Sequence, residues 1–240
     1  MRIHRFTLTL SATAVLLLLC AGPGVRLGLW TFGTGFIVLR WAAYLGLASA
    51  AAALVQLLLA RWRGRHPWQL AVAMGLGLLT AGLPWYWRQR ALQAPPIHDI
   101  TTDTQDPPRF VAILPLRAEA PNPAAYGGAE VAAAQGQAYP DLGPLLLSST
   151  RPALAFQHAL DAARAAGWTI VAAESVAGRI EATATTGWFG FKDDVVTRIR
   201  AVGTGSRIDV RSVSRVGKSD VGTNARRIQT YLRRLTEMSE

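Results

Sequence analysis

The chain has 240 residues, half of them hydrophobic, and its formal net charge at pH 7 is +10. Nine arginines and no acid lie between Met1 and Arg90. The other sixteen Lys and Arg nearly balance all fifteen Asp and Glu, so the rest of the chain has a net charge of +1. A nucleic-acid-binding domain carries its positive charge on the folded domain itself. The charge distribution therefore excludes such a domain, and it places the excess arginines beside apolar segments, where cations meet lipid headgroups.

Three apolar segments, at about 6–25, 38–60 and 69–87, are each near the ~20 residues that cross a bilayer core. We expect them to form a membrane domain of residues 1–90 whose partners are membrane lipids. The first segment has the basic start of a signal peptide, but two more follow, so we expect an uncleaved helix ending near Gly22. Six of the eight tryptophans lie near the predicted helix ends, as in an aromatic belt: Trp30, Trp41, Trp62, Trp68, Trp85 and Trp87.

No ionisable residue lies well inside a segment, which argues against an ion or proton pathway. The N-terminal tail and the Arg61–Arg65 loop carry five arginines on one side of the membrane, and Arg26, Arg40, Arg88 and Arg90 lie on the other. The positive-inside rule then favours, by a single charge, a cytoplasmic N-terminus. We expect a multi-pass protein of the inner membrane with a periplasmic C-terminal domain. Cys20 is the only cysteine, so an internal disulfide is excluded.

Residues 91–150 contain two Pro-Pro pairs and predict an extended linker. Within it, Phe110–Leu116 predicts an edge strand, because Pro115 cannot donate to a central ladder. Arg117–Gly143 is rich in Ala, Gly, Pro and Gln, and we expect little regular structure there.

Residues 151–240 predict a small α+β domain. A helix begins at Pro152 after Ser149 or Thr150 as cap and ends at Gly167, with a buried stripe of Ala153, Phe156, Leu160 and Ala163. Strands are expected at 168–175, 179–186, 194–202 and 207–213, and a last helix at about Asp220–Thr236. The expected fold is therefore three N-terminal transmembrane helices followed by an antiparallel sheet of about four to five strands, with two helices packed on one face.

The stretch RSVSRVGKSDVGTNARRI passes from a strand through a Gly-Lys-Ser-Asp corner into that last helix. Gly217-Lys218-Ser219 matches only the end of a phosphate-loop motif, because the required earlier glycine is Ser212. Helix N-terminal amides beside basic side chains favour an anion, although Ser219 or Asp220 could instead simply cap the helix. The candidate anion- or partner-binding residues are Arg211, Ser214, Arg215, Gly217, Lys218, Ser219, Asp220, Gly222, Asn224 and Arg226.

An aromatic loop is expected first to pack over the end of the core, and second to form an interaction patch. With the acids that follow it, its residues make a second candidate site: Trp188, Phe189, Phe191, Asp193 and Asp194. Paired carboxylates suit general-acid work, but neighbours on a strand point to opposite faces. We therefore expect each to be an exposed turn acid or a partner for Arg198 or Arg215. The four histidines have no zinc-site spacing, and we expect neither metal nor cofactor. Alternating charges on the outer face of the sheet favour a solvent-exposed face over one that meets acidic lipid headgroups or a partner protein: Arg179, Glu181, Arg198, Arg200, Arg207, Asp209 and Arg211.

Four blocks, YPDLGPL, GWTIV, GRIEATATTGWFGFKDDVVTRIR and RIDVRSVSRVGKSDVGTNARRI, resemble the bacterial family of domains of unknown function DUF1499. The resemblance covers about Ala94 to Leu235. It implies that these blocks form one domain, and it supplies no reaction, ligand or catalytic residue.

Three functions remain open. The favoured one is a non-enzymatic envelope protein that binds a partner protein or an anionic envelope component. The second is an envelope hydrolase using Asp193 or Asp194 with Arg215. The third is a structural module that helps the membrane helices to oligomerise.

Overall fold

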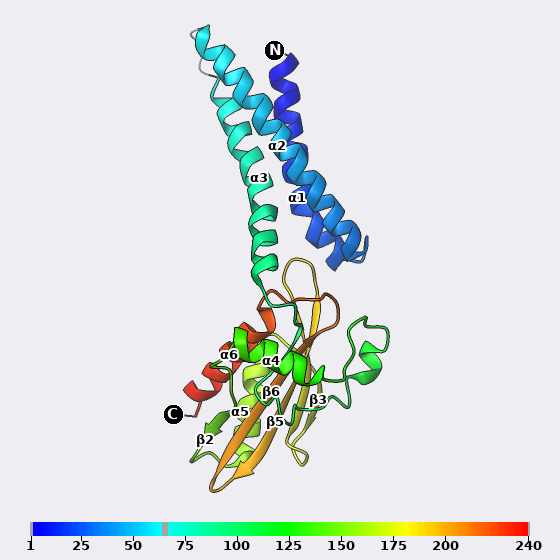
Figure 1. The fold of residues 1–240 in the computed structure, drawn as a ribbon, viewed down its shortest axis with the longest axis vertical. Coiled ribbons are helices and arrows are strands. Elements are labelled where there is room, and N and C mark those ends of the chain that lie inside the picture. The colour runs from blue at the N-terminus through cyan, green and yellow to red at the C-terminus, as the bar shows by residue number, and fades with distance from the viewer. Residues whose placement is uncertain (1, 64–66, 240) are drawn as a thin grey trace. The chain divides into compact units, whose positions relative to one another are not determined.

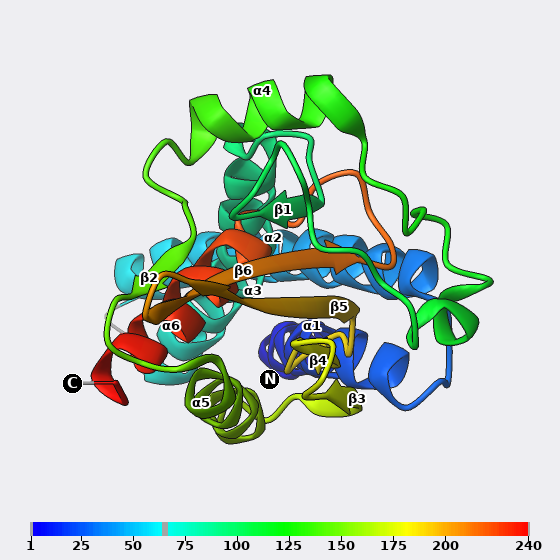
Figure 2. The same cartoon turned by 90° about the horizontal axis from the view of Figure 1, so that it is seen from below.

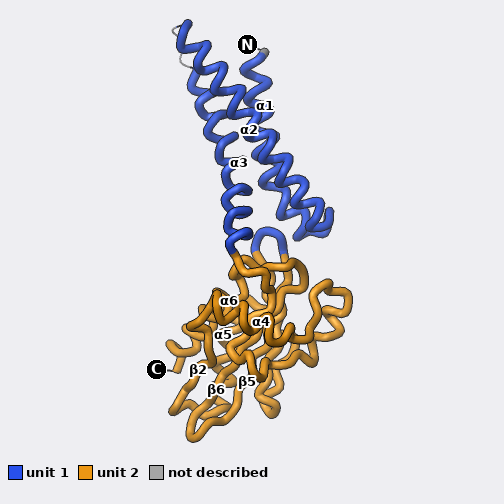
Figure 3. The backbone as a smooth tube through the Cα atoms, viewed as in Figure 1, with its two compact units in different colours: residues 1–93, 187–190 blue, residues 94–186, 191–240 orange. Residues whose placement is uncertain are grey.

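The computed structural model describes residues 2–63 and 67–239 (Figure 1), so the predictions made for Arg65 and His66 lie outside the described residues. The chain divides into two compact units (Figure 3). One comprises Met1–Gln93 with Gly187–Gly190, and the other comprises Ala94–Thr186 with Phe191–Glu240.

The first unit contains the helices α1 (Arg2–Arg26), α2 (Phe32–Trp62) and α3 (Trp68–Gln93). Each is long and apolar enough to cross a membrane, which confirms the three predicted apolar helices. Helix α1 contains Pro23 and ends at Arg26, next to the end predicted for the first apolar segment at about residue 25. Helix α2 begins at Phe32, where the Thr31 hydroxyl accepts a hydrogen bond from the Thr34 amide.

Small residues let α2 and α3 pack closely. A Cβ added at Gly46 would lie 2.7 Å from the Gly77 carbonyl oxygen, and one at Gly77 would overlap the Gly46 carbonyl. Polar side chains inside the bundle bond across helices: Gln56 Nε2 donates to Thr7 Oγ1 at 2.6 Å, and Ser49 Oγ donates to the Thr7 carbonyl at 3.4 Å. Such packing and hydrogen bonding hold helices together where lipid removes the hydrophobic drive.

The second unit is an α+β domain, as predicted. Its antiparallel sheet has the order β1-β6-β5-β4-β3, and β2 also pairs with β6. The strands are β1 (Asp99–Thr101), β2 (Leu145–Leu147), β3 (Thr169–Glu174), β4 (Arg179–Thr185), β5 (Lys192–Val202) and β6 (Gly205–Ser214). The short strands β1 and β2 were not predicted, because three residues are too few to show a period.

Helices α5 (Pro152–Ala165) and α6 (Thr223–Glu237) pack on one face of this sheet. Their buried residues Phe156, Leu160, Ile228 and Leu235 meet apolar strand residues such as Val210. The stripe predicted for α5 is right except at its start, because Ala153 is exposed. Neither Ser149 nor Thr150 caps α5. Its N-cap is Arg151, which makes no capping side-chain bond.

Residues predicted to lack regular structure form helix α4 (Gly128–Ala138). Figure 2 shows α4 beyond the β1 edge of the sheet. There the Gln135 side chain accepts a hydrogen bond from the Thr101 amide at 2.9 Å and donates one to the Thr101 carbonyl at 2.7 Å. The amide thus replaces a neighbouring strand and satisfies an edge that would otherwise be open.

The edge strand predicted at 110–116 is not formed. The chain turns there into a short 3-10 helix, η1 (Leu114–Arg117), which lies against the second face of the sheet. Phe110 and Ile113 pack on Val196 and Val213. The Glu181 carboxylate, with 0% exposure, accepts the amides of residues 111, 112 and 113 at 2.9, 3.1 and 2.9 Å. The expectation of a solvent-exposed face is therefore wrong where this segment covers it.

Candidate functional site

On the covered face, Asp194 of β5 is 0% exposed and binds two arginines. It accepts hydrogen bonds from Arg117 Nη1 at 2.8 Å, from Arg215 Nε and Nη2 at 2.9 Å each, and from Thr183 Oγ1 at 2.9 Å. A carboxylate has about four acceptor positions, so all of them are occupied. Burial lowers the pKa of the Arg117 guanidinium, and the charge of Asp194 opposes that shift.

Asp193 points to the other face, as predicted for neighbours on a strand. Its carboxylate lies 2.5 Å from Arg227 Nη2 of α6. The two acids therefore sit in separate ion pairs, and Asp194 has the predicted partner Arg215.

Arg211, a candidate binding residue, is 2% exposed. Its guanidinium binds Asp99 of β1 through two hydrogen bonds of 2.8 and 2.7 Å and donates to the Ala124 carbonyl at 2.9 Å. It also lies over the rings of Phe110 and Tyr126, 5.2 and 5.4 Å from their centroids. These contacts place Arg211 inside the domain, where it ties the chain between β1 and α4, residues 102–127 (the covering segment), to β1 and β6.

Three other outer-face arginines, Arg198, Arg200 and Arg207, surround Asp209, which is buried, whereas Arg179 pairs with Glu174 and Glu181. Arg198 and Arg200 lie 3.1 and 2.9 Å from its carboxylate, and Arg207 lies 3.0 Å away. Asp103 of the covering segment joins the same network at 2.9 Å from Arg207. These partly exposed arginines hold the covering segment to the sheet through Asp103 and Asp209.

The Gly-Lys-Ser-Asp corner is shaped by its own hydrogen bonds. Gly217 and Gly222 have φ of 94° and 74°, values that glycine adopts without strain. The Asp220 carboxylate accepts the amides of Gly222 at 2.9 Å and Asn224 at 2.6 Å, and so satisfies an amide in the first turn of α6, whose N-cap residue is Gly222. Burial raises the pKa of Asp220, and these two amide bonds oppose the shift. Ser219 Oγ accepts the Val221 amide at 3.2 Å.

Asn224 links this corner to the sheet. Its Oδ1 accepts from Ser212 Oγ at 2.7 Å, and its Nδ2 donates to Ser214 Oγ and to the His98 carbonyl at 3.0 Å each. Asn224 and Ser214 are thus committed to internal bonds. Of the ten candidate residues, Gly217, Lys218 and Arg226 are exposed.

The aromatic loop is divided between the two units. Trp188 and Phe189 belong to the helical unit, where the Phe189 ring lies 5.2 Å from the Phe36 ring. The Phe191 amide donates to Thr186 Oγ1 at 2.9 Å and closes the loop. Asp193 and Asp194 lie within β5.

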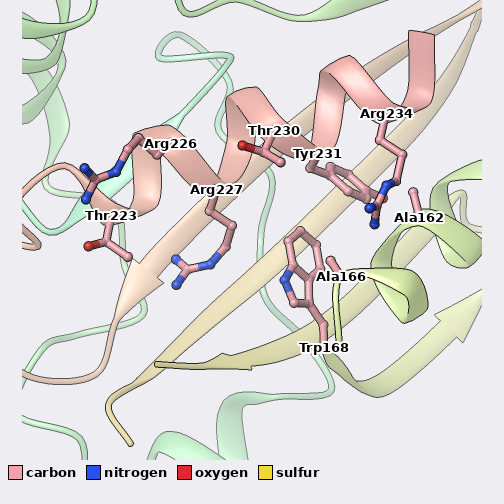
Figure 4. Close-up of a pocket in the computed structure, with 9 residues that line it drawn as sticks. All are labelled: Ala162, Ala166, Trp168, Thr223, Arg226, Arg227, Thr230, Tyr231 and Arg234. Carbon is pink, nitrogen blue, oxygen red and sulfur yellow. The ribbon is translucent and has the colours of Figure 1, made fainter. Parts of the chain in front are cut away.

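A groove of about 310 Å³ lies between α6 and the end of α5 (Figure 4). Arg226, Arg227 and Arg234 line it from α6, and Trp168 lines it beside Tyr231, with ring centroids 4.8 Å apart. Only Arg226 was a candidate from the sequence. Arg226, Thr230 and Arg234 are spaced four residues apart and therefore lie on one helix face. This spacing is the sequence feature from which the basic side of the groove could have been predicted.

Within residues 2–63 and 67–239, no three His, Cys, Asp or Glu side chains are grouped to hold a metal ion. The groove offers guanidinium groups, hydroxyl groups and aromatic rings, which suit binding of an anion better than proton transfer.

No curated protein matches the sequence. The family model described as "Protein of unknown function (DUF1499)" matches residues 99–235, from β1 almost to the end of α6 and over more than half of the chain. With the sheet, the two packed helices and the corner all inside the matched region, the chain belongs to the DUF1499 family.

Proposed function

We propose that this protein is a membrane-anchored, non-enzymatic binding protein of the cell envelope. Helices α1–α3 anchor it in the inner membrane, and the DUF1499 domain binds an anionic envelope component or partner in the periplasm. The arginine count on the two sides of the three apolar helices supports this orientation by one charge.

One observation carries the binding proposal: the domain pairs its buried charges internally, and of the three exposed α6 arginines without an ion pair to a described residue, Arg226, Arg233 and Arg234, the first and the last line the groove. Arg226 and Arg234 are exposed, and among the described residues neither has a carboxylate within 4.0 Å. Arginine binds phosphate and carboxylate groups bidentately. The anionic component therefore binds along α6, with Lys218 at the neighbouring corner adding positive charge.

The geometry favours binding over the hydrolase alternative. Asp194 is fully buried with its acceptor positions filled, and Asp193 is held by Arg227. Freeing either acid would leave a buried arginine uncompensated, at about 3–5 kcal/mol. The oligomerisation alternative is less favoured because Gly46 and Gly77, which allow close helix packing, contact each other between α2 and α3 of the same chain.

The test uses the full chain in nanodiscs of uncharged lipid, exposed to vesicles containing phosphatidylglycerol. Arg226→Glu with Arg234→Glu removes the proposed contacts. Arg164→Glu with Arg233→Glu makes the same change in net charge at exposed positions outside the groove. We expect the first variant to lose vesicle capture and the second to retain it. Equal capture by both variants would reject the proposed site.

A further inference from the structure

We propose that the groove between α6 and the end of α5 binds a phosphate or carboxylate group carried on an apolar or ring-shaped body. This inference rests on the proposed function and names the chemical class of its ligand. Arg234 binds the anion, Trp168 receives the body, and Arg226 adds positive charge at the other end of the groove.

The groove has the size and floor of a small-ligand site. Its volume of about 310 Å³ is comparable to small-molecule pockets. Ala162 and Ala166 keep the α5 wall low, while the Trp168 ring is tilted by 36° against Tyr231. Tyr231 is itself buried, and its hydroxyl donates to the Ala159 carbonyl at 2.8 Å. The floor is therefore preorganised, which reduces the entropy lost on binding.

Trp168 offers two kinds of contact. Its ring is half-buried, so one surface remains open to an apolar or planar group. Its indole N–H makes no hydrogen bond to any residue that the structure describes and is available as a donor. Figure 4 shows the ring lying between the Arg227 and Arg234 side chains, so an anionic group attached to a body on Trp168 comes close to a guanidinium.

The three arginines of the groove have different roles. Arg227 is committed to Asp193 and to Ser212 Oγ, the latter at 3.0 Å. Arg226 and Arg234 are eight residues apart, about 12 Å along the helix. A small anionic ligand stacked on Trp168 therefore contacts Arg234 directly, whereas Arg226 attracts it mainly by longer-range electrostatic interaction.

A second groove of the domain lacks this combination. It measures about 530 Å³ and is lined by residues such as Pro152, Gln157, Val176 and Ile199, with no charged side chain among its lining residues. Only the α6 groove, of these two, places arginine beside an open aromatic ring.

The test is calorimetric titration of the full chain in uncharged maltoside micelles. The probes are phenyl phosphate, inorganic phosphate, phenol and dihexanoyl phosphatidic acid. We expect phenyl phosphate to bind at least about tenfold more tightly than inorganic phosphate or phenol, because only it engages both parts of the groove. Arg234→Ala should weaken its Kd about tenfold and Arg226→Ala about threefold. The control Arg233→Ala, exposed and outside the groove, should leave the Kd unchanged.

Tighter binding of dihexanoyl phosphatidic acid than of phenyl phosphate would identify a lipid headgroup as the source of the anion. The reverse order would identify a soluble ester. Phenyl phosphate that binds no better than inorganic phosphate, or equally to the Arg234→Ala protein, overturns the inference. If anionic vesicles are still captured in that case, the proposed function survives. If phenyl phosphate binds but vesicles are not captured, the ligand site in the groove is supported and the proposed capture of anionic membranes is rejected.

Discussion

Asp194 and Arg215 form a bidentate ion pair, with both guanidinium–carboxylate distances at 2.9 Å. The pair joins β5 to the strand that leads into the Gly-Lys-Ser-Asp corner, and Arg117 of the covering segment binds the same carboxylate. A residue that sequence reasoning offered as a binding group is thereby part of the scaffold. The side chains that a ligand can reach are instead those of α6 that line the groove.

Replacing Asp194 should therefore affect stability first. Asp194→Asn leaves Arg117 buried without its counter-charge, and we expect the free energy of unfolding to fall by about 3–5 kcal/mol. The control Asp161→Asn breaks an exposed pair with Arg164, 3.5 Å apart, and should change it by less than about 1 kcal/mol. Chemical denaturation of the detergent-solubilised chain measures both. Unchanged stability of Asp194→Asn would revive the hydrolase alternative.

Glu181→Gln should loosen the covering segment. The carboxylate accepts three backbone amides, and Arg179 Nε lies 2.9 Å away as an ion pair, although it is not aligned for a hydrogen bond. A neutral amide offers one acceptor oxygen, so we expect a loss of about 2 kcal/mol and faster amide exchange at residues 111–113. Hydrogen-exchange mass spectrometry measures the loss of local stability and the faster exchange of these amides. Glu174→Gln is the matched control, because Glu174 is half-exposed and also pairs with Arg179. Equal exchange in the two variants would contradict this role.

Asp220 should make stability depend on pH. Burial raises its pKa above the ordinary 3.8, so the folded domain holds this proton more tightly than the unfolded chain. Its contribution is therefore fully present below pH 3.8 and is lost as pH rises through the folded-state pKa. Asp220→Asn should remove that part of the slope in unfolding experiments between pH 3.5 and 7. An unchanged slope would mean that Asp220 is not the group responsible.

The proposed orientation places the DUF1499 domain on the periplasmic side of the membrane. In a Cys20→Ala background, Thr204→Cys places one thiol in the exposed turn between β5 and β6. A membrane-impermeant maleimide should label it in spheroplasts without lysis if the domain is periplasmic. Labelling only after lysis would reverse the assignment.

The elements with a clear period could be predicted from the sequence. Ile180, Ala182 and Ala184 alternate along β4, and Ile228, Tyr231 and Leu235 repeat along α6, and all six are buried. The turn at 110–117 could not be predicted, because its amides are satisfied by Glu181, about 70 residues away in sequence. Alternating charged residues along a strand indicate a solvent-exposed sheet face only when no other segment of the chain covers that face.

The groove was predictable only in part for a similar reason. Arg226 stood out beside the corner, whereas Trp168 follows a different helix and meets α6 only in the folded domain. Helix α4 was missed because glycines within and before it weaken the helical pattern, while Gln135 holds it to β1.

The most direct test follows the indole N–H signals of the 15N-tryptophan-labelled full chain in micelles during titration with phenyl phosphate. Trp168→Phe assigns one signal, and the other seven tryptophans serve as internal controls. We predict that the Trp168 signal shifts saturably while the others stay in place, and that Arg234→Ala suppresses the shift. A stationary Trp168 signal, or equal movement of all eight, would contradict a ligand-binding groove on α6.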